Sequence, residues 1–229
     1  MNASWHFQND VTSFAERRQR MVRDQIEARG IRDHRVLDAM NRVPREEFVP
    51  RDLQNEAYDD RPLPIGYGQT ISQPFTVAFM TEALRLAGAE KVLEIGTGSG
   101  YAAAVLACLA NEVHTIERIP SLAQQAERRL ARLGFDNVHL HTANGTLGLP
   151  TYAPFDAIVV TAGADQLPEP YAEQLADGGR IVIPIGPAPT SQTLCRFTRR
   201  GRELNAENLG QFAFVPLIGE HGWHDSSLS

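Results

Sequence analysis

The sequence predicts an α/β fold in which a doubly wound, mostly parallel sheet carries helices on both faces and ends in an antiparallel pair of strands. Short apolar runs typical of buried strands alternate with helical patterns across the middle of the chain. Two further strand-like runs flank Gly201-Arg202, as in a hairpin. Because strand-helix-strand units form parallel sheets, the alternation favours a parallel sheet with an antiparallel edge.

Length and composition are typical of one folded domain. The chain has 229 residues, of which 42% are hydrophobic and 22% charged, so it can bury a full core without disulfides or metal. We expect a disordered tail over residues 1–12 and a single domain over residues 13–229. Within that domain, we expect N-terminal helices and a segment that covers the binding site in 13–75, and the sheet in 76–229.

Charge and cysteine usage exclude several classes of protein. The net charge of -6 argues against a nucleic-acid-binding protein, which needs a basic face. No apolar run approaches the roughly 18 residues of a membrane span, and no signal peptide is recognisable. Cys108 and Cys195 lack C-x-x-C spacing, so we expect neither a disulfide framework nor a zinc site. These features favour a cytoplasmic protein that binds no nucleic acid and no membrane.

The first elements are predicted from spacing and caps. Apolar residues recur at helical spacing between Ser13 and Ala28, and Gly30 is a natural stop. Asp33 caps a second helix, which Pro44 ends. The segment 45–68 is rich in Pro, Gly and charge and has no sustained period, so we expect a long irregular loop with a functional role.

The sheet is predicted in the rest of the chain. A helix begins after Pro74 and runs to about Leu86, and an Ala-rich helix spans 101–110. The expected strands cover residues 91–95, 113–116, 138–141, 157–161, 180–184, 193–199 and 211–217. His139 and His141 share one strand face, but no Asp, Glu or Cys partner has ligand spacing, so we expect packed or exposed side chains and no metal.

The most informative motif is a glycine turn between the strand 91–95 and the following helix. Gly96, Gly98 and Gly100 form the pattern E-x-G-x-G-x-G, whereas the dinucleotide fingerprint G-x-G-x-x-G would need a glycine at Tyr101. Such a turn favours S-adenosylmethionine over NAD. Glu117 closes the next strand, 21 positions after Gly96, near the offset at which a carboxylate reaches ribose hydroxyls.

Several segments together resemble the protein-L-isoaspartate O-methyltransferases. In chain order they are VPREEFV (43–49), GYGQTISQP (66–74), LEIGTGSGY (93–101), PFDAI (154–158), GGR (178–180) and FVPL (214–217). The resemblance runs from about Ser13 to Trp223 and implies a Rossmann-like class I methyltransferase fold. It also implies a cytoplasmic, monomeric enzyme that methylates the free α-carboxylate of L-isoaspartyl residues in damaged proteins and peptides. Repair then proceeds through a succinimide, and S-adenosylhomocysteine is the other product.

The same resemblance implies residue roles. Ser72 is the catalytic residue. The implied cofactor-binding residues are Thr70, Ile71, Ser72, Glu94, Gly96, Gly98, Ser99, Glu117, Arg118, Asn144 and Gly145. The implied substrate-binding residues are Ile65, Gly66, Val215 and Leu217. The family usually has Asp at position 144, where the carboxylate accepts a hydrogen bond from the adenine amino group. Asn144 can still accept this bond, but its neutral oxygen lacks the negative charge that strengthens it.

Some alternatives remain open from sequence alone. Ser72 precedes a helix and would also serve as an N-cap, and Glu94 would also be a charge at a strand end. Residues 214–217 either pair with an extended substrate or form a core strand. The tail with His221, Trp223 and His224 either covers the substrate groove or docks loosely. Two other functions are a carboxylate methyltransferase with a dedicated peptide partner and a noncatalytic binding module.

Overall fold

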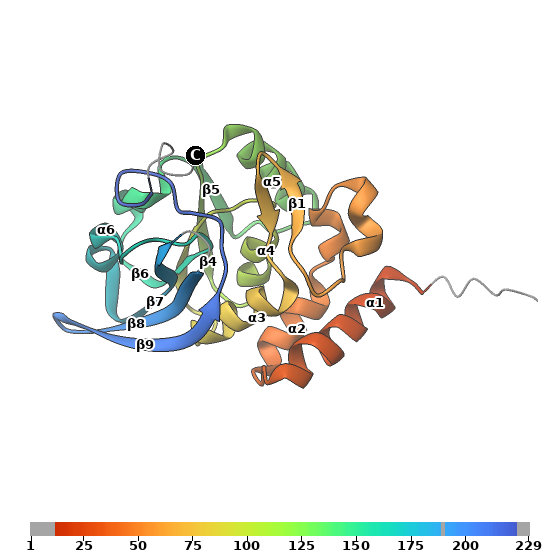
Figure 1. Cartoon of the computed structure of the whole chain (residues 1–229), viewed down its shortest axis with the longest axis horizontal. Helices are drawn as coiled ribbons and strands as arrows, with labels where there is room; N and C mark the ends of the chain where they lie inside the picture. The colour runs from red at the N-terminus through yellow and green to blue at the C-terminus, as the bar shows by residue number, and fades with distance from the viewer. Residues whose placement is uncertain (1–11, 189–190, 224–229) are drawn as a thin grey trace, which may run out of the picture.

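The fold is built around one large sheet (Figure 1). The computed structural model describes residues 12–188 and 191–223, and within them seven strands form a sheet in the order β5-β4-β3-β6-β7-β8-β9. Their bounds are β3 Lys91–Ile95, β4 Glu112–Glu117, β5 Val138–Thr142, β6 Phe155–Val160, β7 Leu175–Ala188, β8 Ser191–Arg200 and β9 Glu203–Phe212. Strands β3 to β7 pair in parallel, and β8 and β9 pair antiparallel. The predicted fold class is therefore confirmed.

Helices cover both faces of this sheet. In chain order, the helices of the described part of the chain are α1 Phe14–Arg20, which packs against α2, then α2 His34–Arg42, α3 Pro74–Ala83, α4 Tyr101–Ala107, α5 Pro120–Arg132 and α6 Glu169–Glu173. Alternate strand residues point to opposite faces, so Val92 joins the core beneath α2, α3 and α4, whereas Leu93 joins the core that contains Tyr171 of α6. None of the helices in the described part of the chain has the length and apolar character needed to span a bilayer.

The N-terminal helices begin where their caps predict. Ser13 accepts a hydrogen bond from the backbone of Glu16, whose carboxylate accepts from Ser13 N in return. The helix then widens into a π turn, η1 Met21–Ile26, and a 3₁₀ turn, η2 Glu27–Arg29, and ends at Gly30 with φ +106°. Asp33 caps α2 through the backbone N–H of Arg35. Residues 1–11, most of the predicted tail, lie outside the described part of the chain.

The segment 45–68 is more ordered than the sequence predicted. It contains the 3₁₀ turns η3 Arg45–Phe48 and η4 Arg51–Glu56, and then the strand β1 Leu63–Gly66. This strand pairs antiparallel with β2 Gln69–Ile71. The sequence analysis missed this two-stranded hairpin because both strands are short. Its turn residues Gly66, Tyr67 and Gly68, all with positive φ, have a composition that is also typical of an irregular loop. The hairpin leads directly to Ser72.

Several predicted boundaries were wrong. Helix α4 ends at Ala107 rather than at residue 110, and β7 runs from Leu175 to Ala188 rather than over 180–184. Helix α3 ends at Ala83 rather than near Leu86, because Arg85 takes a left-handed conformation with φ +52°. The last strand is Glu203–Phe212 and not 211–217. Strand β9 is largely exposed and polar, so it lacks the apolar alternation that reveals a strand, whereas the apolar run 213–217 leaves the sheet and bridges Gly163 at Pro216. The predicted antiparallel pair of strands at the end of the sheet is confirmed by the pairing of β8 with β9.

Between the strands lie two further 3₁₀ turns, η5 Gly145–Leu147 and η6 Pro150–Tyr152. They occupy the crossover from β5, at one edge of the sheet, to β6, which lies on the other side of β3. The chain order therefore reverses at β3. In open α/β sheets, ligands bind at such a reversal, outside the carboxyl ends of the strands.

Candidate active site

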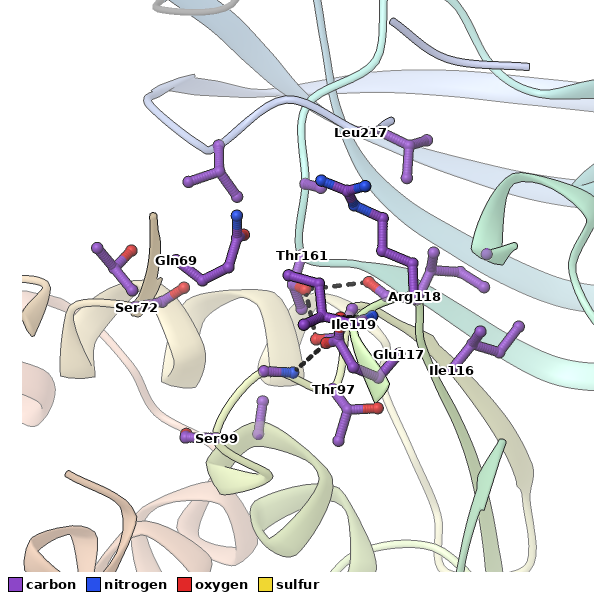
Figure 2. A pocket seen from close by; sticks show the side chains of 18 of the residues that line it. Gln69, Ser72, Thr97, Ser99, Ile116, Glu117, Arg118, Ile119, Thr161 and Leu217 are labelled. Carbon is purple, nitrogen blue, oxygen red and sulfur yellow. Dashed lines mark hydrogen bonds between the residues drawn. The ribbon is translucent and has the colours of Figure 1, made fainter. Parts of the chain in front are cut away.

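A cavity of about 820 Å³, open to solvent, lies at this reversal. Its walls come from the glycine turn after β3, the ends of β4 and β6, the β2–α3 junction and the segment that follows β9. Figure 2 shows Gln69 and Ser72 on one side of the cavity and Glu117 and Arg118 on the other.

The glycine turn requires glycine for two separate reasons. Gly96, Gly98 and Gly100 have φ values of +99°, +52° and +88°, a region that other residues rarely adopt. In addition, a Cβ on Gly96 would overlap the hydroxyl of Thr161. That hydroxyl lies within hydrogen-bond distance of two carbonyls, Ile95 O at 3.0 Å and Gly96 O at 2.8 Å, so it is fixed to the turn it supports.

Glu117 holds the same turn from the side of β4. Its Oε2 accepts from Gly98 N at 2.8 Å and its Oε1 accepts from Ile119 N at 2.9 Å, and the residue is only 6% exposed. Each carboxylate oxygen has a second lone pair. Glu117 is therefore a preorganised acceptor that lines the cavity and can still receive hydroxyl donors.

The structure places Glu94 beneath the cavity wall rather than in it. Glu94 is completely buried, and its Oε2 accepts from Thr115 Oγ1 at 2.6 Å. Thr115 Oγ1 lies 2.6 Å from Thr97 Oγ1, and Thr97 belongs to the glycine turn. Burial raises the pKa of Glu94 to about 8, against the opposing hydrogen bond from Thr115. Glu94 therefore supports the turn through two threonines.

Ser72 lies where two hollows meet. It lines the cavity described above and also a wider groove bordered by Arg29, Phe75 and residues 211–215. The two share Thr70, Ser72, Thr161 and Val215. Within the groove, the Arg29 guanidinium carbon lies 3.6 Å from the centre of the Phe75 ring. A reacting group in the groove would thus meet a molecule in the cavity beside Ser72.

The N-cap interpretation of Ser72 is wrong. The N-cap of α3 is Gln73, and no side chain caps this helix. Among the described residues, the Ser72 hydroxyl makes no hydrogen bond, whereas its backbone carbonyl accepts from Arg45 Nη2 at 2.8 Å. The hydroxyl is therefore available to a ligand.

Most of the residues singled out from the sequence meet at this site. The cavity is lined by Thr70, Ile71, Ser72, Gly96, Gly98, Ser99, Glu117, Arg118, Gly145, Val215 and Leu217. Gly145 must be glycine because a Cβ there would lie 2.8 Å from Ile95 Cγ2. Val215 and Leu217 are fixed by paired bonds with Gly163, at 2.8 Å each. This arrangement is not the core strand considered for 214–217.

Besides Glu94, three of these residues do not line the cavity. Asn144 caps η5, and its Oδ1 accepts from Thr146 N at 3.1 Å and from Thr146 Oγ1 at 2.9 Å. The Ile65 side chain packs behind the glycine turn, where a Cβ on Gly98 would contact it at 3.4 Å. Gly66 lies in the β1–β2 turn with φ +92°. Asn144 and Ile65 thus adjoin residues that line the cavity.

Sequence reasoning missed several lining residues, of which Thr97, Tyr101, Ile119 and Thr161 are the most consequential. A signal for Thr161 was present, because it ends a predicted strand next to β3 in the sheet. The neighbour of β3 was not specified by the sequence, however. The sequence patterns place Tyr101 at the end of the family segment 93–101 and at a helix start, but they assign it no contact with a ligand.

The tail docks beside the site. The Trp223 indole donates to Gly163 O at 3.1 Å, and His221 N donates to Thr146 Oγ1 at 3.3 Å. These bonds attach the tail to η5 and to the loop after β6, both at the cavity mouth. His224 lies outside the described residues.

The histidine pair on β5 contacts a third histidine on β4. His114 is 2% exposed, with Nδ1 3.1 Å from His141 Nε2 and Nε2 3.0 Å from Glu112 Oε1. Burial lowers the pKa of His114, while Glu112 opposes the shift. Across the described ranges, no group of three or more His, Cys, Asp or Glu side chains has a geometry that could hold a metal ion.

Comparison with known proteins gives a consistent picture. The family model for protein-L-isoaspartate(D-aspartate) O-methyltransferase matches residues 16–222. The chain is 56% identical to protein-L-isoaspartate O-methyltransferase 1 of Rhodopseudomonas palustris (strain HaA2), over 94% of this chain and 88% of that protein. It is 57% identical to protein-L-isoaspartate O-methyltransferase 2 of Marinobacter nauticus (strain ATCC 700491 / DSM 11845 / VT8), over 93% of this chain and 98% of that protein.

Two solved structures are also similar. A protein-L-isoaspartate O-methyltransferase matches with a TM-score of 0.79 and 30% identity, over 89% of this chain and 66% of that longer chain. A Plasmodium falciparum protein described as a beta-aspartate methyltransferase matches with a TM-score of 0.77 and 25% identity, over 88% of this chain and 98% of that chain. The latter was solved in complex with S-adenosyl-L-homocysteine.

Proposed function

Because this chain belongs to the protein-L-isoaspartate O-methyltransferase family, we propose that the cavity and the groove that meet at Ser72 form its active site. The protein is an enzyme that transfers a methyl group from S-adenosylmethionine to the free α-carboxylate of L-isoaspartyl residues in damaged proteins and peptides. The cavity takes S-adenosylmethionine, and the groove takes the isoaspartyl chain.

The residues of the cavity fit S-adenosylmethionine. Gly96, Gly98 and Ser99 line the side that we assign to the methionine end, and Glu117 offers the second lone pairs of both carboxylate oxygens to the ribose hydroxyls. Gly145 lines the side that we assign to the adenine, next to the Asn144 cap. Thr70, Ile71 and Arg118 complete the walls. The preorganised Glu117 carboxylate is the observation that carries this assignment.

The reaction needs little from the protein besides placement. When bound, S-adenosylmethionine supplies an electrophilic methyl group, which leaves its sulfonium sulfur for a carboxylate oxygen and gives a methyl ester and S-adenosylhomocysteine. The isoaspartyl α-carboxylate has an ordinary pKa of about 4, so it is ionised at neutral pH and needs no general base. We assign to Ser72 a hydrogen bond from its hydroxyl to that carboxylate. Such a donor orients the attacking oxygen without competing as a nucleophile.

The groove suits many substrates rather than one. Its border includes Gln211 and Phe212 at the end of β9 and the segment 213–215 that follows them. Recognition through main-chain contacts tolerates varied neighbours of a damaged residue. We propose that an extended substrate binds along this border in that way, which favours repair of many proteins over a dedicated peptide partner. Repair then continues without this enzyme, since the neighbouring backbone nitrogen expels the ester to form a succinimide.

We further propose that the enzyme acts as a monomer in the cytoplasm, without binding nucleic acid or membranes. Both cysteines, Cys108 and Cys195, are free thiols in the structure, as suits a reducing compartment. The net charge of -6 disfavours contact with polyanions. Size-exclusion chromatography with light scattering tests the monomer directly, and a stable dimer would contradict it.

A methyl-transfer assay tests the proposed activity and specificity. An isoaspartyl peptide and its normal aspartyl twin differ only in which carboxylate joins the backbone. We expect methylation of the isoaspartyl peptide and none of its twin above background. Equal methylation of both would indicate a general carboxylate methyltransferase, and methylation of neither would contradict the proposed function.

A further inference from the structure

Arg45 is a charged residue at the centre of the core. It begins η3 and is 0% exposed, yet no carboxylate among the described residues pairs with it. Its Nε donates to Ala57 O at 2.7 Å and its Nη2 donates to Ser72 O at 2.8 Å. The guanidinium carbon also lies 4.8 Å from the centre of the Tyr101 ring. The side chain thus joins three segments that are far apart in sequence.

This burial is unfavourable for folding alone. Removing a guanidinium from water without a counter-charge costs several kcal/mol, and an apolar side chain of similar size packs at such positions with no such penalty. One nitrogen, Nη1, has no hydrogen-bond partner among the described residues. The contacts of Arg45 therefore suggest a geometric role that an apolar residue would not fill.

One of those contacts fixes the backbone of Ser72. Ser72 and Gln73 connect the end of β2 to the first residue of α3, Pro74, and so belong to neither element. The Gln73 carbonyl accepts a hydrogen bond from Val77 N at 3.2 Å. The Ser72 carbonyl accepts its hydrogen bond from the Arg45 side chain. Since the Ser72 hydroxyl makes no bond of its own within the described residues, the backbone sets where it points.

The ring contact links the same side chain to the cofactor wall. Tyr101 is the first residue of α4, directly after Gly100 of the glycine turn, and it lines the cavity. Phe48, three residues after Arg45, packs edge-on against it with ring centres 5.5 Å apart. Arg45 therefore contacts both Ser72 and the lining residue that follows the glycine turn.

We propose that Arg45 is a positioning residue for methyl transfer, which holds the Ser72 backbone at a fixed place relative to the cofactor cavity. This inference rests on the role proposed for Ser72. Arg45 touches no substrate. It acts through the Ser72 carbonyl, and its effect on the rate exists only while the Ser72 hydroxyl is present.

A set of variants tests this role. Arg45→Met roughly keeps the side-chain volume and removes both hydrogen bonds. Arg45→Lys keeps the positive charge but loses the planar guanidinium that donates both bonds. Arg196→Met is the control for loss of a buried arginine. Arg196 is also buried and donates to a backbone carbonyl, Ala83 O at 3.2 Å, away from the site, and it differs from Arg45 in pairing with Glu207. All are assayed at a temperature where thermal unfolding shows them folded, with active sites counted by S-adenosylhomocysteine titration.

We expect Arg45→Met to lower kcat at least about tenfold, while the KM for the peptide changes less than about threefold. Arg45→Lys should fall between Arg45→Met and the wild type, and Arg196→Met should keep its kcat. In the double variant with Ser72→Ala, kcat should equal that of Ser72→Ala alone, because the two residues act as a unit. A normal kcat for folded Arg45→Met, or additive losses in the double variant, would overturn the inference.

A second measurement does not depend on activity. Hydrogen exchange followed by mass spectrometry should show faster exchange in residues 70–76 in Arg45→Met than in Arg196→Met, with equal protection of β6 in both. Unchanged protection of 70–76 contradicts the positioning role. If the wild type fails to methylate isoaspartyl peptides but the exchange difference appears, the proposed function is wrong. The result would still show that Arg45 fixes the backbone at Ser72.

Discussion

Glu117 on β4 accepts a hydrogen bond from the backbone N–H of Gly98 at 2.8 Å, so the carboxylate and the glycine turn are joined before any ligand binds. The bond gives Glu117 two roles. It fixes the glycine turn along one side of the cavity, and in the cofactor site that we propose it leaves the remaining lone pairs of Glu117 for the ribose. A ligand that needs both features finds them already in place, which lowers the cost of ordering the site.

Glu117→Ala should weaken the binding of S-adenosylhomocysteine by about 10- to 100-fold, since hydrogen bonds to a charged group contribute about 1.5 to 3 kcal/mol. Calorimetry with S-adenosylhomocysteine measures the change, and NAD should give no heat with either protein. Glu112→Ala, at the opposite end of β4, is the control and should bind normally. Tight NAD binding by the wild type would show that the cavity has been assigned to the wrong ligand.

Ser72→Ala should lower methyl transfer to an isoaspartyl peptide by about 10²-fold or more while leaving the melting temperature unchanged. The hydroxyl makes no bond within the described structure and caps no helix, so its removal costs little stability. Ser13→Ala is the opposite control: Ser13 is a true N-cap, so this variant should lose about 1 kcal/mol of stability and keep its turnover. Near-normal turnover of Ser72→Ala per folded molecule would remove Ser72 from the catalytic machinery.

The sequence predicted the sheet core more accurately than its surroundings. The strand Lys91–Ile95 was predicted to the residue, because both of its faces are buried and Val92, Leu93 and Ile95 are apolar. Strand β9 was misplaced because it is exposed and polar. The cavity was predicted largely through the glycine turn and the family motifs, which are local in sequence. Thr161 was missed because its proximity to Gly96 depends on β6 lying next to β3, and local patterns do not encode strand order.

Asn144→Asp should tighten the binding of S-adenosylhomocysteine by up to about tenfold. Asn144 Oδ1 is already engaged by Thr146, so an aspartate would keep that cap with one oxygen and present a charged acceptor with the other. The adenine amine is the donor expected to use it. Calorimetry decides, with Asn137→Asp as a control remote from the cavity; an unchanged dissociation constant would mean that Asn144 does not face the adenine.

Glu94→Gln should stabilise the protein increasingly as the pH rises from about 5 to about 8.5. Burial raises the pKa of Glu94 from its ordinary 4.5 to about 8, so between these values the folded state keeps a proton that the unfolded state releases. Stability of the wild type therefore falls as the pH rises through this window, and the loss is complete above the folded pKa. Glutamine has nothing to ionise and can still accept from Thr115.

The measurement is the difference in melting temperature between Glu94→Gln and the wild type across that pH range, because the titration of other groups cancels in the difference. It should be small at pH 5, just above the ordinary pKa of 4.5, because the unfolded wild type has only begun to lose a proton that the folded state keeps. At pH 8 a gain of about 1 to 3 kcal/mol corresponds to several degrees for a chain of this size. Affinity for S-adenosylhomocysteine should change less than about threefold, since Glu94 supports the glycine turn only through Thr115 and Thr97. A difference that stays flat with pH would show that Glu94 ionises normally, and a large loss of affinity would place its carboxylate in the cavity wall after all.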